Sequence, residues 1–423
     1  MAVGSRFERR RDLEADGAAS ASPSERGHDR RLTIRIRHDR GLSRIAKVEA
    51  WPVNVPLEAP YEMAPGIVAG IHRTVVRVTT EDGVAGLGET PSPGDATSLG
   101  CDLGPTFVGR DTAEALAALG RRERPAADHR NDSKVLIDNP RVGIELALWD
   151  IAAREAGVPL HELLGPVCRT EVAFTEYFAY RDGREQSPAE VAAYCARMIE
   201  EHDSPAFEGK VGVRSADDDV RLAREIRAAI GERTLRLDAN MGWTLETARE
   251  VLSLLEPLDV ANVEEPVGSF PEMAALRRST AIPFSSHIPD PARAAELGAP
   301  DAIVIGLAFC GGIAGTRRFI TECERAGVGF WFYSGDLGIA TAAYLHVAAA
   351  TPYLDQPSQS LLRWTTDDVI PGGPFQPKRG VVPVPEGPGL GVELDDKALA
   401  RCVERYAREG AYDFYGGPPP PRY

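Results

Sequence analysis

The sequence predicts an α/β protein in which a parallel (β/α) barrel follows a smaller α+β unit. After Glu171 a pattern of short strand, turn and helix recurs about every 25–30 residues, and such strict alternation is typical of a parallel sheet. Seven strand-like runs follow this pattern, which favours a closed barrel over an open, doubly wound sheet. The 423 residues, 43% of them apolar, suffice for more than one core and exclude disorder of the whole chain.

The part of the chain before the barrel is predicted to contain a tail and an α+β domain. Residues 1–44 are rich in arginine and poor in apolar side chains, which is typical of a flexible, solvated extension. Pro and Gly residues at 60–70 predict a loop long enough to serve as a lid. The strands and the helix expected in the domain at 45–170 are 45–51, 73–80, 84–89 and 141–156.

The barrel is predicted to occupy residues 171–360. Helical periodicity lies between its strands, for example at 189–201 and 217–230. The segment 361–423 is expected to return over the first domain and to end in a disordered, proline-rich tail. The expected strands are 172–178, 206–211, 235–239, 260–264, 282–286, 302–305 and 329–333.

Composition narrows the classes of function. A formal net charge of −15 would repel nucleic acid. The six cysteines are scattered without a CxxC motif, which predicts neither a disulfide framework nor a zinc site and indicates a reducing, cytoplasmic location. The sequence has no apolar run of membrane-spanning length and no signal-peptide pattern at its start, so no membrane association is expected.

Polar residues gather at the predicted carboxyl ends of successive barrel strands. Alternation places Glu208 and Lys210 on one face of the second strand. The next three strands end with Asp238, Glu264 and His287. Because strand ends converge on the mouth of a barrel, two carboxylates there would repel each other unless a cation lay between them. The pattern therefore predicts a site for a hard divalent ion, with Mg²⁺ as the first choice.

Several stretches of the chain resemble the enolase superfamily in its mandelate racemase/muconate-lactonizing enzyme branch, most of all the glucarate dehydratase group. They are Glu81-Asp-Gly-Val-Ala-Gly-Leu-Gly-Glu-Thr90, Gly143-Ile-Glu-Leu-Ala-Leu-Trp-Asp-Ile151, Gly157-Val-Pro-Leu-His-Glu-Leu-Leu-Gly165, Asp238-Ala-Asn240, Glu264-Glu-Pro266 and Gly387-Pro-Gly-Leu-Gly-Val-Glu-Leu-Asp395. The resemblance implies a modified (β/α)7β TIM barrel with an N-terminal α+β capping domain. It also implies that a base removes the proton α to a substrate carboxylate bound at a metal ion.

The resemblance assigns roles to individual residues. The family's Lys-x-Lys motif reads Glu208-Gly209-Lys210 here, so only the second lysine, the base, is kept. Asp238 and Glu264 fall on metal-ligand positions. The third ligand position falls on His287, and because imidazole is a poor ligand for Mg²⁺, Mn²⁺ or another divalent ion is an alternative cofactor.

The far side of the implied site departs from the family. The position of a second catalytic histidine falls on Asp336, and the position of its aspartate partner falls on Gly306. Asp336 is therefore the candidate acid, or a residue that binds a substrate hydroxyl, and capping of the following helix is its alternative role. The candidate substrate-binding residues are Tyr177, Asn240, Glu208 and Arg363.

These residues predict a cytoplasmic, metal-dependent carbon–oxygen lyase (hydro-lyase) that dehydrates an acid sugar or a related hydroxy acid. With Lys210 as the only secure base, elimination of water is favoured over racemisation, which needs two opposed proton carriers. Two alternatives stay open: a racemase, epimerase or cycloisomerase of the same superfamily, and a degenerate barrel that binds a ligand or a partner subunit without turnover. The expected partner is a small-molecule carboxylate, and the resemblance implies a homo-oligomer.

Overall fold

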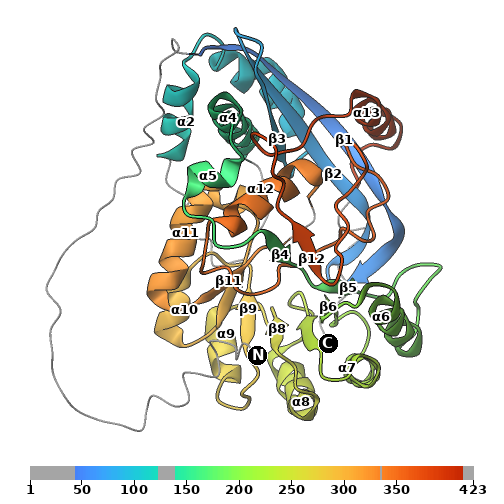
Figure 1. Ribbon diagram of the computed structural model, residues 1–423. Coiled ribbons are helices and arrows are strands. Elements are labelled where there is room, and N and C mark those ends of the chain that lie inside the picture. The colour runs from blue at the N-terminus through green and yellow to red at the C-terminus, as the bar shows by residue number, and fades with distance from the viewer. Residues whose placement is uncertain (1–42, 122–138, 334–335, 413–423) are drawn as a thin grey trace, which may run out of the picture. The chain divides into compact units, whose positions relative to one another are not determined.

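A three-stranded antiparallel sheet and a seven-stranded parallel sheet dominate the computed structural model, which describes residues 43–121, 139–333 and 336–412 (Figure 1). The predicted fold class is confirmed: a curled parallel sheet with helices follows an N-terminal domain built on an antiparallel sheet. Almost all of the predicted arginine-rich tail, and the chain beyond residue 412, lie outside the described residues.

The antiparallel sheet has the strand order β1-β2-β3. Its strands are β1 (Ile45–Met63), β2 (Gly66–Thr80) and β3 (Ala85–Thr90). The loop predicted at 60–70 is wrong, because β1 and β2 continue through it and pair Tyr61 with Val68 and Met63 with Gly66. β1 is an edge strand, so its prolines, which lack an N–H, can stay in the strand at positions that face away from β2.

Helices pack on the antiparallel sheet, and two glycines of β3 allow α4 (Arg141–Ala156) to approach this strand closely. A Cβ at Gly86 would lie 2.1 Å from the carbonyl oxygen of Ala147, and one at Gly88 would lie 1.9 Å from that of Gly143. Both carbonyls belong to α4, so β3 tolerates no side chain at these positions. The helical segments of this region are α1 (Asp95–Thr97), η2 (Ser98–Leu103), η3 (Gly104–Thr106), α2 (Thr112–Gly120), α4 (Arg141–Ala156) and α5 (Leu160–Leu164).

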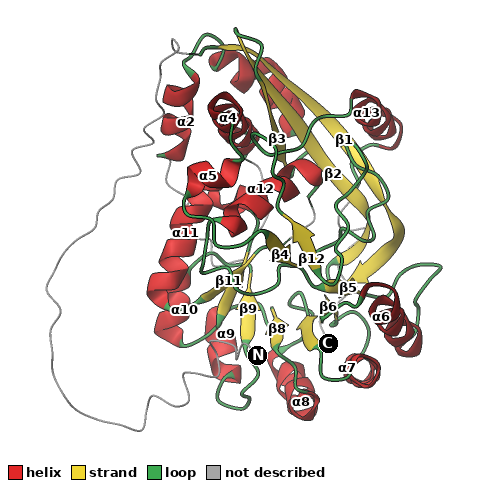
Figure 2. Cartoon of the chain, in the orientation of Figure 1, coloured by secondary structure: helices red, strands yellow, loops and turns green. Residues whose placement is uncertain are grey.

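The parallel sheet has the order β11-β10-β9-β8-β7-β6-β5, so each strand pairs with its neighbour along the chain. Figure 2 shows helices beside the strands that they connect. The strands are β5 (Glu176–Phe178), β6 (Ala206–Lys210), β7 (Thr234–Asp238), β8 (Asn262–Glu264), β9 (Phe284–Ser286), β10 (Ala302–Val304) and β11 (Gly329–Trp331). The helices are α6 (Pro188–His202), α7 (Ala216–Ile230), α8 (Leu245–Leu255), η4 (Glu256–Leu258), α9 (Phe270–Leu276), α10 (Pro291–Leu297), η5 (Leu307–Cys310) and α11 (Ile313–Ala326).

A short segment after the last helix of the barrel links the two edges of the parallel sheet. The backbone N–H of Gln359 donates to the carbonyl of Phe332, just after β11. On the other side, Ser358 donates to Ala173 and accepts from Thr175, next to β5. The segment therefore takes the place of an eighth strand. The helix that precedes it is α12 (Gly338–Ala349).

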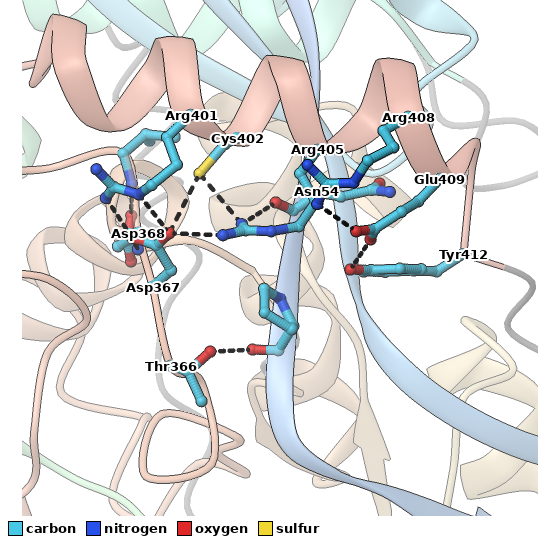
Figure 3. A network of polar contacts seen from close by, with 12 residues as sticks. Asn54, Thr366, Asp367, Asp368, Arg401, Cys402, Arg405, Arg408, Glu409 and Tyr412 are labelled. Atoms are coloured by element: carbon cyan, nitrogen blue, oxygen red, sulfur yellow. Dashed lines mark hydrogen bonds and ion pairs between the residues drawn. The ribbon is translucent and has the colours of Figure 1, made fainter.

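The C-terminal segment returns to the N-terminal domain. β12 (Val381–Pro383) pairs with β4 (Glu171–Ala173), and α13 (Asp396–Glu409) packs against β1. Arg401 and Arg405 of α13 both form ion pairs with Asp367, at 2.6 and 3.2 Å (Figure 3). Arg405 also donates to the backbone oxygen of Asn54 in β1. None of the described helices is long and apolar enough to cross a membrane.

Candidate active site

Five polar side chains predicted as site residues lie together at the carboxyl ends of neighbouring parallel strands. The sheet register pairs Tyr177 with Glu208, Lys210 with Asp238, and Asp238 with Glu264. The Lys210 ammonium contacts Asp238 and lies 5.8 Å from the ring centre of Tyr177. The members of this ring of side chains are Tyr177, Lys210, Asp238, Glu264 and His287.

A second layer of polar side chains lies beneath this ring and contains Glu208. Its carboxylate is fully buried and accepts from Thr175 at 3.2 Å and from Gln359 at 2.9 Å. Arg236 lies 3.5 Å from it. Alternation places Glu208 one step below Lys210, where protein groups surround it, and its contact with substrate stays a prediction.

Lys210 and Asp238 form a buried ion pair. Lys210 is 5% exposed and Asp238 is 1% exposed. Burial alone would lower the pKa of Lys210, but the Asp238 carboxylate outweighs it and holds that pKa well above its ordinary value. In this arrangement Lys210 stays protonated. It can act as an amine base only when Asp238 interacts with another cation.

The His287 ring is held by an acceptor at each nitrogen. Nδ1 lies 2.5 Å from the carbonyl oxygen of Val304, so this nitrogen carries a hydrogen, since a carbonyl can only accept. Nε2 lies 3.0 Å from Glu264 Oε1. Burial opposes the charged ring, yet Glu264 and Glu265 raise the pKa of His287 above its usual range. The imidazolium therefore balances the charge of Glu264.

The donor atoms of this ring suit a divalent cation. Two buried carboxylates on neighbouring strands are hard oxygen ligands. A histidine whose Nδ1 donates to a backbone carbonyl presents Nε2 to a metal in the usual manner. The buried Oδ1 of Asn240 also has no hydrogen-bond partner. The described residues contain no group of three His, Cys, Asp or Glu side chains already spaced around one point. The match to a cation therefore rests on the kinds of donor atoms present, and not on their spacing in this structure.

Asn240 and Tyr177 lie where the sequence places them. Asn240 follows β7 with φ of 43°, and its backbone N–H donates to Asp238 Oδ1 at 2.9 Å. Tyr177 is 6% exposed, and the rings of Tyr61 and Trp364 pack edge-on against it at 6.0 and 5.3 Å. Tyr61 comes from the end of β1, so the hairpin β1–β2 covers this side of the ring.

Asp336 lies on a different wall, next to the N-terminus of α12. Arg73 of β2 donates to its Oδ1 at 2.9 Å, and the Tyr344 hydroxyl donates to its Oδ2. Glu89 lies 3.5 Å from Arg73 and accepts from the backbone N–H groups of Leu337 and Ala340. Glu89, rather than Asp336, therefore takes part in capping the helix.

Arg363 forms an ion pair away from the ring, and its contact with substrate stays a prediction. Its Nε lies 2.7 and 2.9 Å from the two carboxylate oxygens of Glu176. Glu176 also accepts from Tyr194 and Ser204, on the side of β5 that faces α6. Because alternation turns Glu176 away from the face that carries Tyr177, Arg363 is held outside the barrel.

Sequence reasoning missed three residues that hold the site together: Arg73, Gln359 and Tyr61. Arg73 and Tyr61 lie in alternating strands, where nothing marks them as different from other strand residues. Gln359 donates to Glu208 and, at 2.6 Å, to Glu264, so it bridges two strands that are far from it in sequence. Only the fold brings these side chains to the site.

The sequence and the fold match known families over both parts of the chain. Residues 45–165 match the mandelate racemase/muconate lactonizing enzyme N-terminal domain, and residues 190–398 match the enolase C-terminal domain-like family. The chain therefore belongs to the mandelate racemase/muconate lactonizing enzyme family of the enolase superfamily. It is an enzyme of that superfamily by descent, as the ring of strand-end residues also indicates.

Individual relatives differ in the reactions that they are named for. The chain is 28% identical to "Probable glucarate dehydratase" of Streptomyces coelicolor, over 80% of this chain and 87% of the relative. It is 30% identical to D-Ala-D/L-Ala epimerase of Cytophaga hutchinsonii, over 82% and 95% of the two chains. A crystal structure of an enolase from Pseudomonas fluorescens, with bound magnesium, potassium and tartrate, has a TM-score of 0.78, 25% identity, and coverage of 88% of this chain and 95% of that one.

Proposed function

We propose that the protein removes the proton α to the carboxylate of a small hydroxy acid and then eliminates the β-hydroxyl as water. The observation that carries this proposal is the Lys210–Asp238 pair within the ring of Tyr177, Lys210, Asp238, Glu264 and His287. A lysine amine beside carboxylates that suit a cation is a candidate general base for removing a proton next to a substrate carboxylate. The dehydratase among the relatives supports elimination.

Asp238, Glu264 and His287 are the residues that would hold a divalent cation, Mg²⁺ or Mn²⁺. Such a cation supplies Lewis-acid stabilisation of negative charge on the substrate carboxylate. Magnesium in the Pseudomonas fluorescens enolase supports this part of the proposal. Asn240, with its unpartnered Oδ1, and Tyr177 would orient the substrate beside Lys210.

Two sides of the site would carry out the two proton transfers. Lys210, once its partner Asp238 interacts with another cation, accepts the α-proton on Nζ. The wall that carries Asp336, Arg73 and Tyr344 is the side from which the leaving hydroxyl would be protonated. Buried aromatic rings around Tyr177 keep water away from the amine, which favours the neutral base.

Exchange of the α-proton in D₂O tests the proposal. We expect the wild-type protein with Mg²⁺ or Mn²⁺ to exchange this proton in tartrate or D-glucarate and to release the dehydrated keto acid, followed by NMR. Lys210→Met should lower exchange by at least about 10³-fold. Lys47→Met, which removes an exposed lysine of β1, is the matched control and should leave exchange unchanged. Exchange by Lys210→Met at the wild-type rate would refute the proposal.

A second candidate is epimerisation, which the D-Ala-D/L-Ala epimerase relative favours. It predicts exchange in both stereoisomers of one substrate, such as the dipeptide D-Ala-D-Ala and its epimer, without loss of water. Calorimetric titration with Mg²⁺ and Mn²⁺ tests the cation site independently of turnover. Asp238→Asn and Glu264→Gln should each weaken binding.

A further inference from the structure

Tyr333 stands at the end of β11 and faces the same interior as the ring of site residues. Side chains alternate along a strand, so Tyr333 shares a face with Trp331. Trp331 points into the barrel, because the guanidinium of Arg236 from β7 lies 4.2 Å from its ring centre. Tyr333 packs against the buried cluster of Ala302, Val304 and Trp331. Tyr333 therefore lies at the level of the ring of site residues, above the layer that contains Glu208.

Tyr333 comes from a strand that is well separated from the strand of the amine base. Four strands separate β11 from β6 in the sheet, so Tyr333 and Lys210 come from well-separated parts of its curve. The Tyr333 ring lies 5.7 Å from that of His287, at 69°. Gly306 beside it has no side chain, and a Cβ there would lie 3.6 Å from Tyr333 Cδ1. Tyr333 is half-buried, whereas Lys210 is buried, so Tyr333 is the more exposed residue of the two.

Charged side chains lie on one side of Tyr333. Asp336 accepts from both Arg73 and Tyr344, so its carboxylate serves as an acceptor. Burial would lower the pKa of Arg73, but Asp336, Tyr333 and Glu89 lie close enough to raise it. Arg73 therefore lies close to both the Asp336 carboxylate and the Tyr333 ring.

We propose that Tyr333 is the catalytic acid that protonates the departing β-hydroxyl, with Arg73 and Asp336 as positioning residues. The inference rests on the proposed function. Lys210 takes the α-proton, the C–O bond breaks, and the hydroxyl leaves with the phenol proton as water while the α,β double bond forms. The proton on Lys210 then returns through water to the Tyr333 phenolate, which restores both groups. The substrate class is a small carboxylic acid with a β-hydroxyl group.

Tyr333→Phe separates proton abstraction from loss of water. With tartrate in D₂O, we expect α-proton exchange to stay within about threefold of the wild type, while formation of oxaloacetate falls on the order of 10²–10⁴-fold. With 3-fluoromalate the same product forms by loss of fluoride, which needs no proton as it leaves. The variant should therefore form oxaloacetate from 3-fluoromalate within about tenfold of the wild-type rate, a rescue that a merely structural role would not give.

The matched control is Tyr353→Phe. This tyrosine donates to the carbonyl of Val328 at 2.8 Å, at the opposite end of β11, and its loss should change neither exchange nor elimination. If Tyr333→Phe still dehydrates tartrate at the wild-type rate, or loses both leaving groups equally, the role of Tyr333 is refuted while the proposed function stands. If Lys210→Met still exchanges the α-proton, the proposed function itself fails.

Discussion

Lowering the pH from 7 to 4 is expected to destabilise the fold by about 3 kcal/mol through His346 alone. His346 of α12 is fully buried and contacts two other segments. Its Nδ1 lies 3.3 Å from the backbone N of His161 and 2.9 Å from His161 Nδ1. Because a backbone N–H can only donate, His346 Nδ1 is an acceptor, and Nε2 carries the hydrogen that faces the carbonyl of Leu390 at 3.1 Å.

This network accepts only the neutral ring. A proton on Nδ1 would face two donors, and burial lowers the pKa of His346 from 6.5 to about 4. Between these two values the unfolded chain binds a proton that the folded protein does not bind, so stability falls as the pH falls. The stability that the neutral His346 ring contributes is fully present above about pH 7 and is lost by about pH 4. At 1.36 kcal/mol per pKa unit, the difference amounts to about 3 kcal/mol.

Urea unfolding of the wild type and of His346→Asn at several pH values between 7.5 and 4 measures this contribution. The substitution removes the titrating ring and is expected to lower stability at pH 7. Only the wild type loses stability by excluding a proton from this ring. The difference in unfolding free energy between the two proteins should therefore narrow by about 3 kcal/mol as the pH falls. A gap of constant size across the range would refute the assignment of the neutral ring.

Two further substitutions test how the two parts of the chain are joined. Glu145→Ala should lower the free energy of unfolding by about 3–6 kcal/mol. The Glu145 carboxylate accepts from the backbone N–H groups of Ile313 and Ala314 and from the Trp149 indole at 2.9–3.0 Å, and the substitution leaves these three donors without it. A loss below about 1 kcal/mol in urea unfolding would contradict this expectation. Asp367→Asn should cost only about 1 kcal/mol, since its arginine partners on α13 are partly solvated (Figure 3). Hydrogen exchange should quicken in α13 and not in the barrel strands, and equal acceleration in both would speak against a local clamp.

Much of the fold was predictable because periodicity and burial coincide. The helix predicted at 141–156 has those bounds, and each predicted barrel strand overlaps an observed one. The hairpin tip at 60–70 was not predictable, because proline and glycine are typical of loops. Only the tertiary position of β1 at the edge of its sheet makes prolines acceptable there.

The candidate site also contains residues that the sequence could predict and contacts that it could not. Lys210 and Asp238 were found because strand alternation alone decides which face they occupy. The partner of each charged group was not predictable, since it depends on which distant segments meet. Arg363 is the clearest case, because its pairing with Glu176 joins residues 187 positions apart. Gln359 enters the interior by the same kind of long-range contact.

The interior of the barrel is balanced in charge by its own side chains, and this balance bears on how the base is activated. Three buried carboxylates of the interior each lie next to one cationic group. While this holds, Lys210 keeps its proton and cannot accept one from carbon. Activation of the base therefore requires that Asp238 exchange its partner, and binding at the carboxylates and release of the amine become a single coupled event. The pairs are Glu208 with Arg236, Asp238 with Lys210, and Glu264 with His287.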